Sequence, residues 1–556
     1  IKEKSELYKM NFKTRQISSL SRVFLDGNCA LDEICSASAL KGERYSYQIA
    51  YQSEDSFTAE ISVESPLSQY ISLREVGSVP SELPVYKSDC GCYERTEPGL
   101  FPDVLYPVKN GSLLVKRDCF YSLWVTAELP ENIDAGEYGI TIKFLREGEE
   151  LSSDTFYLKV VDAVLPAQTL IYTQWFHCDG IAQYYNAPVF GEKFWKLTEE
   201  FIKTAVHTGI NMLLTPVFTP PLDTAVGGER LTVQLADVKI CGGQYYFNFD
   251  KFKKWVGIAR KNGIKYFEIS HLFSQWGAKY APKIVAELDG TQKKIFGWET
   301  PADSPAYKEF LKVFLPELIA VIRSLGIEKS TFFHISDEPN KEQAASYKKA
   351  KEIIAPLVEG FPVIDALSDY EYYKNGLVSH PIPGTDEIEN FIEKGFPHPW
   401  TYYCCSQREK LSNRFFGTPL SAERAIGIQF YKFGIEGFLQ WGYNFYNSRF
   451  SLRSINPFCV TDADGAFPSG DAFSVYPGES GALESIRSVV FYEALQDMRA
   501  LQLLGSLLGR DKCIFLIENK FGKITFTQYP RQKDEIIRLR EFINKAISES
   551  IKKECP

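Results

Sequence analysis

The hydrophobic pattern of this 556-residue chain changes once, near residue 165, and this change limits the folds that the chain can adopt. Before it, segments with alternating apolar and polar residues, such as RYSYQIAYQ and YGITIKFLRE, are separated by turn sequences such as ENIDAGEYG. Such alternation is typical of strands that bury one face. Residues 1–165 are therefore predicted to form an antiparallel β-sandwich with a scaffold role.

Beyond residue 165, short apolar segments alternate with longer amphipathic ones such as FWKLTEEFIKTAVHTG and YKEFLKVFLPELIAVIRSLG, which is typical of parallel β/α units. The predicted strands are residues 169–176, 210–216, 264–270, 331–336, 361–367, 376–382, 401–406 and 437–444. Eight such units predict a (β/α)8 TIM barrel over residues 166–480. The fold class is thus a multi-domain chain that combines an all-β and an α/β domain.

Residues 481–556 are predicted to form a C-terminal extension that packs on the barrel. Residues 482–509 have the pattern of one long helix, and a short pair of strands is expected after it. The last segment is amphipathic and predicts a packed terminal helix. Its apolar stripe consists of Ile536, Leu539, Phe542, Ile543 and Ile547.

Composition excludes several classes of function. Hydrophobic residues make up 44% of the chain and charged residues 24%, as in globular proteins with large cores. A net charge of −9 without a basic cluster argues against nucleic acid or an anionic membrane as the main partner. The sequence contains no run of about 18 apolar residues, so no membrane span is predicted. The 12 sparsely spaced cysteines and the absence of a signal core predict a cytoplasmic protein, or a secreted one whose signal peptide has been removed.

Two adjacent carboxylates, Asp337 and Glu338, end the fourth predicted strand in the segment TFFHISDEPN. The reactive face of a (β/α)8 barrel is built from the carboxyl ends of its strands, so both residues are expected at the functional site. A purely structural alternative is that they open the next helix together with Pro339, with Asn340 as its cap. That alternative does not explain the other polar and aromatic residues at the same strand ends.

These residues follow the first, second, third and eighth predicted strands. Flat rings combined with hydrogen-bonding side chains suit the apolar face and the hydroxyl groups of a sugar. Each residue alone is more typical of core packing, and only their joint position favours a carbohydrate site. The predicted substrate-binding residues are Trp175, His177, Thr215, His271, Trp276, Trp441, Tyr443 and Asn444, with Asp179 and Gln275 beside them.

Adjacent carboxylates restrict the chemistry of hydrolysis. Neighbours in an extended segment point to opposite sides of the chain, so they are poorly placed to flank one anomeric carbon. The seventh strand, TYYCCS, offers no Asp or Glu and is expected to carry Cys404 and Cys405 on the barrel wall. A substrate with a 2-acetamido group can supply its own nucleophile, and the protein then needs a proton donor and a residue that orients the amide.

The segments PGLFPDVLYP, SLWVTAELP, QWFHCDGIAQYY, FHISDEP and FLQWGYNFYNS resemble glycoside hydrolase family 123, the β-N-acetylgalactosaminidases. The resemblance implies a retaining exo-enzyme that removes terminal β-GalNAc from glycans or glycosphingolipids. It implies Glu338 as the general acid/base and Asp337 as the residue that stabilises an oxazolinium-like intermediate. We expect burial and the negative neighbour Asp337 to raise the pKa of Glu338.

Two other functions remain open: a β-N-acetylhexosaminidase of different specificity, and a non-hydrolytic carbohydrate-binding protein on the same barrel. No cofactor is expected, because no nucleophile elbow or phosphate-binding loop occurs. No metal is expected either, since the sequence lacks HExxH and paired CxxC motifs. The neighbours His177, Cys178 and Asp179 have no second group of ligands at metal-site spacing.

Overall fold

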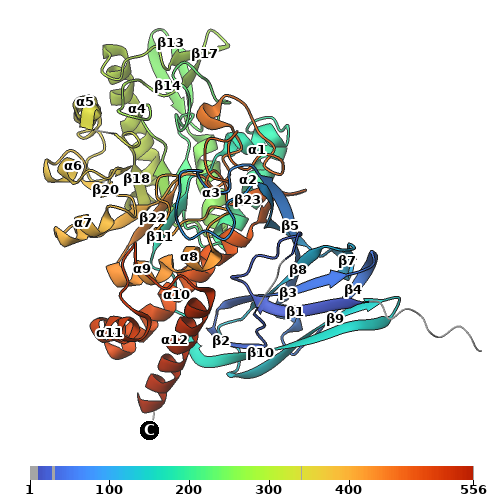
Figure 1. Ribbon diagram of the computed structural model, residues 1–556. Helices are drawn as coiled ribbons and strands as arrows, with labels where there is room; N and C mark the ends of the chain where they lie inside the picture. The colour runs from blue at the N-terminus through green and yellow to red at the C-terminus, as the bar shows by residue number, and fades with distance from the viewer. Residues whose placement is uncertain (1–10, 28–31, 340, 555–556) are drawn as a thin grey trace, which may run out of the picture.

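The computed structural model describes residues 11–27, 32–339 and 341–554. It has an N-terminal all-β body, lower right in Figure 1, and a larger body of helices and short strands above it. The all-β body contains two five-stranded sheets. One has the order β1 (Phe12–Ser18), β3 (Arg44–Ser53), β8 (Phe120–Glu128), β5 (Ile71–Ser81), β6 (Gly99–Pro107). The other has the order β2 (Ser36–Lys41), β10 (Glu149–Val164), β9 (Gly136–Arg146), β4 (Phe57–Glu64), β7 (Ser112–Val115).

The predicted alternation of the sandwich strands is visible in their burial. On β9, Ile140, Ile142 and Phe144 are fully buried at every second position, so they pack into the core between the sheets. One strand pair departs from the predicted antiparallel arrangement, because β2 runs parallel to β10. The strand that follows β2, β3, belongs to the other sheet, so no hairpin sets the direction of β2 against its neighbour.

Eight short strands of the second body fall within or beside the predicted segments. They are β11 (Ile171–Gln174), β12 (Met212–Thr215), β15 (Tyr266–Ile269), β18 (Thr331–Phe333), β19 (Ile364–Ala366), β20 (His380–Ile382), β21 (Trp400–Tyr402) and β22 (Gly437–Gln440). All residues of β12 and β22 are buried, which explains why their apolar runs are continuous.

Helices connect these strands and cover them on the outside (Figure 1). They are α1 (Cys178–Tyr184), α2 (Glu192–His207), α3 (Asp250–Lys261), α4 (Pro305–Ser324), α5 (Ala344–Ile354), α6 (Tyr370–Lys374), α7 (Ile388–Glu393), α8 (Leu420–Arg424) and α9 (Ile426–Phe433). Two long connections form an added four-stranded sheet, with β13 (Asp237–Cys241), β14 (Gln244–Asn248), β16 (Ile284–Leu288) and β17 (Thr291–Phe296).

The closed sheet of the predicted TIM barrel is not confirmed. Hydrogen bonds among the described residues divide the eight strands into three sheets, with the orders β11-β22-β21, β12-β15-β18 and β19-β20. Single bridges pair Phe333 with Val363 and Gly384 with Tyr402 between these sheets. Each strand has only three or four residues, so its hydrogen-bond ladder is short. All pairs within the three sheets are parallel, and the carboxyl ends of paired strands therefore lie at the same edge.

The chain after β22 forms a small hairpin, β23 (Val475–Pro477) and β24 (Ala482–Glu484), and three helices, α10 (Ile486–Leu508), α11 (Arg510–Phe521) and α12 (Lys533–Glu554). The strand pair expected after α10 is wrong, because α11 occupies residues 510–521. The buried residues of α11, Cys513 and Ile517, are four positions apart, which is a helical spacing that the β-prone sequence CIFLIENKF conceals. No described helix is long and apolar enough to cross a membrane.

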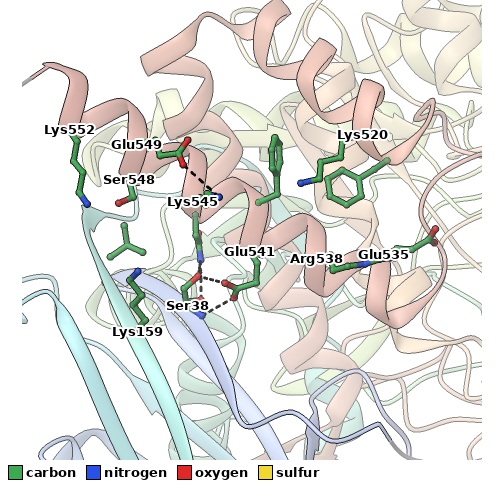
Figure 2. A pocket seen from close by; sticks show the side chains of 14 residues that line it. Ser38, Lys159, Lys520, Glu535, Arg538, Glu541, Lys545, Ser548, Glu549 and Lys552 are labelled. Carbon is green, nitrogen blue, oxygen red and sulfur yellow. Dashed lines mark hydrogen bonds and ion pairs between the residues drawn. The ribbon is translucent and has the colours of Figure 1, made fainter.

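The terminal helix α12 joins the two bodies. Ile536, Leu539, Ile543 and Ile547 of the predicted stripe are buried in the hydrophobic core. Beside this stripe, α12 and β2 border a surface groove (Figure 2). Both the backbone N–H and the hydroxyl of Ser38 donate to the carboxylate of Glu541, at 2.8 and 2.7 Å. Polar contacts therefore seat α12 on the edge of the sandwich.

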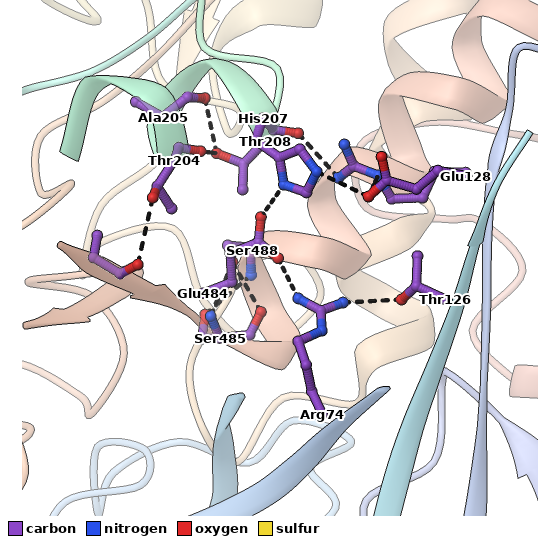
Figure 3. Close-up of polar contacts among 12 residues, drawn as sticks. Arg74, Thr126, Glu128, Thr204, Ala205, His207, Thr208, Glu484, Ser485 and Ser488 are labelled. Atoms are coloured by element: carbon purple, nitrogen blue, oxygen red, sulfur yellow. Dashed lines mark hydrogen bonds and ion pairs between the residues drawn. The ribbon is translucent and has the colours of Figure 1, made fainter. Parts of the chain in front are cut away.

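A second junction lies between the sandwich and the hairpin β23–β24 (Figure 3). Glu484 accepts hydrogen bonds from Arg74 of β5 and contacts the ring of His207 at the end of α2. The other ring nitrogen of His207 lies 3.0 Å from Glu128 of β8. Burial alone would lower the pKa of His207, but the two carboxylates outweigh it and raise that pKa. The imidazolium form of His207 therefore joins both bodies.

A third junction is the ion pair of Asp103 on β6 with Arg487 on α10. Both side chains are buried, and the two hydrogen bonds between them measure 2.9 Å. Arg487 also donates to the carbonyl oxygens of Gly470 and Phe473, at 2.8 and 3.0 Å, and Tyr476 donates to Asp103 at 2.6 Å. These hydrogen bonds compensate both charges for the loss of water on burial, so the buried ion pair is tolerated.

We predict that Arg487→Met lowers the free energy of unfolding by about 3–5 kcal/mol, because it leaves the carboxylate of Asp103 buried and unpaired. Equilibrium urea denaturation measures this loss. The double variant Asp103→Leu/Arg487→Met removes both charges and is expected to recover part of the lost stability. A double variant that is less stable than Arg487→Met would contradict this explanation.

Candidate active site

A cavity opens where the carboxyl ends of the parallel strands meet. Its walls come from the segments that follow strands distant in the sequence, and they combine aromatic rings with three carboxylates. The polar and aromatic lining residues are Trp175, Asp223, Gln275, Trp276, Asp337, Glu338, Tyr402, Cys404, Cys405, Trp441, Arg449, Phe450 and Phe467. Asp337 and Glu338 therefore face one cavity, as predicted from their position after β18.

The backbone at Glu338 brings these neighbouring carboxylates to the same side. Glu338 has a φ of 42°, in the left-handed region that side chains other than glycine rarely adopt. Its N–H donates to the carbonyl oxygen of Ala366 at the end of β19, at 3.0 Å, and this bond holds the turn. The extended geometry expected from the sequence, with the two side chains on opposite sides, is therefore replaced by a turn that directs both into the cavity.

Each carboxylate has its own hydrogen-bond donor. Gln275 Nε2 donates to Asp337 Oδ2 at 2.6 Å, and the hydroxyl of Tyr402 donates to Glu338 Oε1 at 2.9 Å. Burial and the negative charge of Glu338 raise the pKa of Asp337 well above its ordinary value. Burial also raises the pKa of Glu338, with a further contribution from Asp386 and an opposing one from Tyr402. The pKa of Glu338 is thus raised as expected, but by burial and Asp386, and the expected contribution of Asp337 is not among the causes.

Asp223 is a third carboxylate in the cavity and was not predicted. Its N–H donates to Gln275 Oε1 at 2.5 Å, and its Oδ2 accepts from the N–H of Phe450 at 2.9 Å. Burial raises the pKa of Asp223 to about 6. Gln275 therefore connects the Asp223 loop to Asp337. Its side-chain oxygen can only accept and its NH2 group can only donate, so the NH2 group is the one that serves Asp337.

Positive φ values recur around the cavity. Besides Glu338, the lining residues Asp223, Trp276 and Phe450 have φ values of 40°, 54° and 59°. Such conformations cost about 1–3 kcal/mol each and persist where the surrounding structure enforces them. The rings of Trp276 and Phe450 meet edge to face at 5.7 Å, so two of the strained residues support each other.

Beneath the cavity lies a fully buried layer of charge formed by Glu268, His334 and Asp365. The ring nitrogens of His334 lie 2.5 Å from Glu268 and 3.2 Å from Asp365. Burial opposes protonation of this ring, but the two carboxylates raise the pKa of His334 to about 9. His334 is therefore an imidazolium between two carboxylates at neutral pH.

This charged layer positions residues on both sides of the cavity. Glu268 Oε1 accepts from the indole N–H of Trp175 at 2.7 Å. Asp365 Oδ1 accepts from the N–H groups of Ile335 and Ser336, at 3.1 and 3.3 Å, just before Asp337. Glu268 and Asp365 were not predicted. Each is a single acid within an apolar strand, and this was the available signal, because a buried acid requires a charge partner.

The wall of the cavity that carries Trp441 is held by Asp471. The indole N–H of Trp441 donates to Asp471 Oδ2 at 3.0 Å, and burial raises the pKa of Asp471 to about 7. Arg414 donates to the Asp471 carbonyl and to Gln440 Oε1, both at 2.6 Å. The orientation of this aromatic surface is therefore set by buried polar groups.

Of the eight predicted substrate-binding residues, Trp175, Trp276 and Trp441 line the cavity. The five others are buried outside the lining. His177 contacts the Trp441 carbonyl and Arg230, and burial lowers its pKa to about 3. Asn444 exchanges hydrogen bonds with the backbone of His177. Thr215 donates to the Leu213 carbonyl and Tyr443 to that of Phe201.

His271 packs below the cavity instead of lining it. Its ring stacks on His334 with centroids 4.2 Å apart and an angle of 21°, and it has no hydrogen-bond partner among the described residues. Ligand atoms of His271, His334 and Asp365 lie within 4.8 Å of one another. Nearly parallel rings cannot direct their in-plane lone pairs at one ion, and both nitrogens of His334 already face carboxylates. The geometry of this trio therefore suits hydrogen bonding better than metal binding.

Tyr402, Cys404 and Cys405 are further lining residues that the sequence did not predict. The strand β21 ends at Tyr402, three residues before Cys405, so the expectation that both cysteines lie on a strand is wrong. They follow the strand and line the cavity. The tandem aromatic and cysteine residues of TYYCCS conceal the end of the strand, because both residue types are common in buried strands.

Comparison with known proteins agrees with this arrangement. A model of the glycoside hydrolase 123 catalytic domain matches residues 175–504, more than half of the chain. A family 123 glycoside hydrolase from Clostridium perfringens, studied for glycolipid glycan hydrolysis, has a similar structure, with a TM-score of 0.72, 15% identity and 98% of each chain covered.

A family 5 xyloglucanase from Bacteroides ovatus has a TM-score of only 0.29, with 9% identity, 83% of this chain and 98% of that chain covered. A search of curated proteins finds no match. The match over residues 175–504 includes every residue of the cavity described above. The chain therefore belongs to glycoside hydrolase family 123.

Proposed function

We propose that the protein is a retaining exo-β-N-acetylgalactosaminidase that uses the 2-acetamido group of its substrate as the nucleophile. The observation that carries this proposal is the pair Asp337 and Glu338, two adjacent buried carboxylates that face one cavity and have separate hydrogen-bond donors. Two groups from one turn of backbone can act on the same sugar from the same side. Such a pair suits a substrate-assisted reaction, because the nucleophile comes from the sugar and the protein supplies a proton donor and a group that orients the amide.

Asp337 is suited to orient the acetamido group. With Oδ2 held by Gln275, its other oxygen can accept the amide N–H of the substrate. This hydrogen bond directs the carbonyl oxygen toward the anomeric carbon, and the carboxylate stabilises the positive charge that develops on the oxazolinium ring. Burial strengthens that electrostatic stabilisation, because little water is present to screen it.

Glu338 is suited to protonate the glycosidic oxygen. Its raised pKa keeps a proton available, and Tyr402 occupies Oε1 so that Oε2 is free to transfer the proton. In the second step the carboxylate removes a proton from the water that opens the oxazolinium ring. Two displacements at the anomeric carbon restore the β configuration.

The aromatic lining supports an N-acetylhexosamine as the ligand. Trp175 and Trp441 present apolar surface next to hydrogen-bonding groups, a combination that suits a pyranose ring. The Clostridium perfringens relative is described as acting on glycolipid glycans, which favours a glycan or glycosphingolipid as the substrate here. The terminal β-GalNAc of this proposal comes from the resemblance in sequence. An N-acetylhexosaminidase of other specificity and a non-hydrolytic sugar-binding protein are the alternatives.

The experiment that tests this function uses 4-nitrophenyl glycosides of β-GalNAc, β-GlcNAc and β-galactose. We expect cleavage of the β-GalNAc compound, slower cleavage of the β-GlcNAc compound and none of the β-galactoside, which lacks the acetamido nucleophile. Proton NMR of the first product formed should show the β anomer. Cleavage of the galactoside, or release of the α anomer, would reject the substrate-assisted mechanism.

Asp337→Asn is expected to reduce kcat at least hundredfold, about 3 kcal/mol of transition-state stabilisation, with a much smaller change in KM. Stopped assays on the β-GalNAc substrate measure both constants. Asp223→Asn provides the matched comparison, because it removes a negative charge from the same cavity. The side-chain oxygen of the asparagine can still accept the Phe450 N–H. A greater loss in Asp223→Asn than in Asp337→Asn would assign the main role to Asp223.

Glu338→Gln should lose far more activity on substrates with poor leaving groups than on nitrophenyl glycosides, which need little protonation to depart. A methylumbelliferyl or nitrophenyl glycoside compared with a GalNAc-terminated oligosaccharide measures this difference. Equal losses on both would remove Glu338 from the acid role.

The same variant also has an expected pH dependence. Glu338 must carry a proton to act as the acid, so the basic limb of kcat/KM reports the loss of that proton. Glutamine has no such proton to lose, and the basic limb on the nitrophenyl substrate should therefore disappear in Glu338→Gln. A basic limb that stays at the wild-type pH would contradict the assignment of Glu338 as the acid.

A further inference from the structure

Two adjacent thiols in the catalytic cavity have no part in the proposed hydrolysis. Cys404 and Cys405 are both partly exposed, and both line the cavity together with Glu338 and Tyr402. Because they are neighbours in the chain and line one cavity, their two thiols open into the same space. The pair therefore lies on the Glu338 side of the cavity.

The turn that carries these thiols is held by buried side chains. Gln407 Oε1 accepts from the N–H of Cys404 at 2.9 Å, and Asn413 Nδ2 donates to the Cys404 carbonyl at 2.8 Å. Both residues are almost completely buried. The N–H of Cys405 is hydrogen-bonded to Asp471, which also holds Trp441. The two sulfur atoms are thus presented by a fixed backbone.

This geometry favours a dithiol over a disulfide. Neighbouring Cα atoms lie ~3.8 Å apart across a trans peptide bond, and all described peptide bonds are trans. A disulfide normally requires Cα atoms about 4.4–6.8 Å apart. None of the ten cysteines in the described part of the chain is in a disulfide. Two neighbouring thiols without a covalent partner can instead bind one soft atom between them.

We propose that Cys404 and Cys405 form a vicinal dithiol site for trivalent arsenicals, and that occupation of this site stops catalysis in the adjoining cavity. With phenylarsine oxide the arsenic forms one bond to each sulfur and its bond to oxygen breaks. The two thiol protons leave on that oxygen as one molecule of water. No oxidation state changes, and the phenyl group remains in the space that a sugar would occupy beside Glu338 and Trp441.

Two sulfur atoms on one arsenic distinguish this site from an ordinary reactive cysteine. A single thiol gives an adduct that other monothiols displace, whereas release from a vicinal pair requires both arsenic–sulfur bonds to break.

In the experiment the protein is treated with one equivalent of phenylarsine oxide. Intact mass spectrometry measures the bound phenylarsenic groups. Hydrolysis of a nitrophenyl glycoside that the protein cleaves measures activity. In the wild-type protein we expect at least tenfold loss of activity that survives excess 2-mercaptoethanol and is reversed by 2,3-dimercaptopropanol. Cys404→Ser and Cys405→Ser should each bind one phenylarsenic group fewer and need at least tenfold more reagent for half inhibition.

Cys90 and Cys92 offer a matched control, because they are also close in sequence and are exposed outside the cavity. Cys90→Ser/Cys92→Ser should keep the wild-type sensitivity of hydrolysis, and the two cavity variants can be compared in this background to remove any binding at the exposed pair. Unchanged adduct number in both cavity variants, or stoichiometric binding without inhibition in the wild type, would overturn the proposal.

The mass measurement separates this inference from the proposed hydrolysis. If no glycoside is cleaved, the proposed function fails, but loss of one adduct in Cys404→Ser and Cys405→Ser still supports the dithiol site. Conversely, cleavage of the β-GalNAc substrate with equal adduct numbers in all variants leaves the function intact and rejects the site.

Discussion

The contact between protonated His334 and two buried carboxylates, Glu268 and Asp365, positions both Trp175 and the backbone before Asp337 in the candidate active site. Isolated charges at full burial are strongly unfavourable, so each member of this layer requires the others. Glu268 comes from β15, His334 follows β18 and Asp365 lies in β19, so the layer joins two of the three sheets. The hydrogen bonds that Asp365 accepts just before Asp337 then determine where the chain turns into the cavity.

Because the strands are short, side chains take over part of the role that a continuous sheet would have. Among the described residues the three sheets share isolated backbone bridges, whereas side chains of the charged layer connect all three. Thr173 of β11 donates to Glu268 of β15, and Asp365 of β19 contacts His334 after β18. Hydrogen bonds to charged groups are stronger than those between neutral groups and have narrower geometry. A domain held in this way can keep its cavity in a precise shape although its strands pair over only a few residues.

The sequence predicted the order of elements well, because periodicity is a local property. Alternation identified the sandwich, and the eight strands of the second body fall within or beside the expected segments. The parallel pairing of β2 with β10 was missed because it depends on contacts far along the chain, and the helix α11 was missed because its β-prone residues conceal a helical spacing. The same limit applies to the site. Asp337 and Glu338 were recognised from one short segment, but Gln275 was named only as a neighbour, and Tyr402 and Asp223 became visible only when distant loops met. Conversely, His177, Thr215 and Asn444 stand at strand ends yet point into the protein, which residue type alone does not reveal.

The turn at Glu338 connects this limit to the chemistry. In an extended segment, one of the two carboxylates would face away from the cavity, and the adjacent pair could not act on one sugar. The left-handed backbone at Glu338 costs about 1–3 kcal/mol, and the hydrogen bond to Ala366 together with the Asp365 contacts must hold it in place. Each carboxylate then receives a donor from a different loop, Gln275 for Asp337 and Tyr402 for Glu338, which gives two equivalent acids different surroundings. Burial raises the pKa of both carboxyl groups, so burial alone does not separate their roles. In the proposed reaction, the positive charge that develops beside Asp337 keeps that group ionised while Glu338 donates its proton. The strain at Glu338 is then the cost of placing both groups in one cavity.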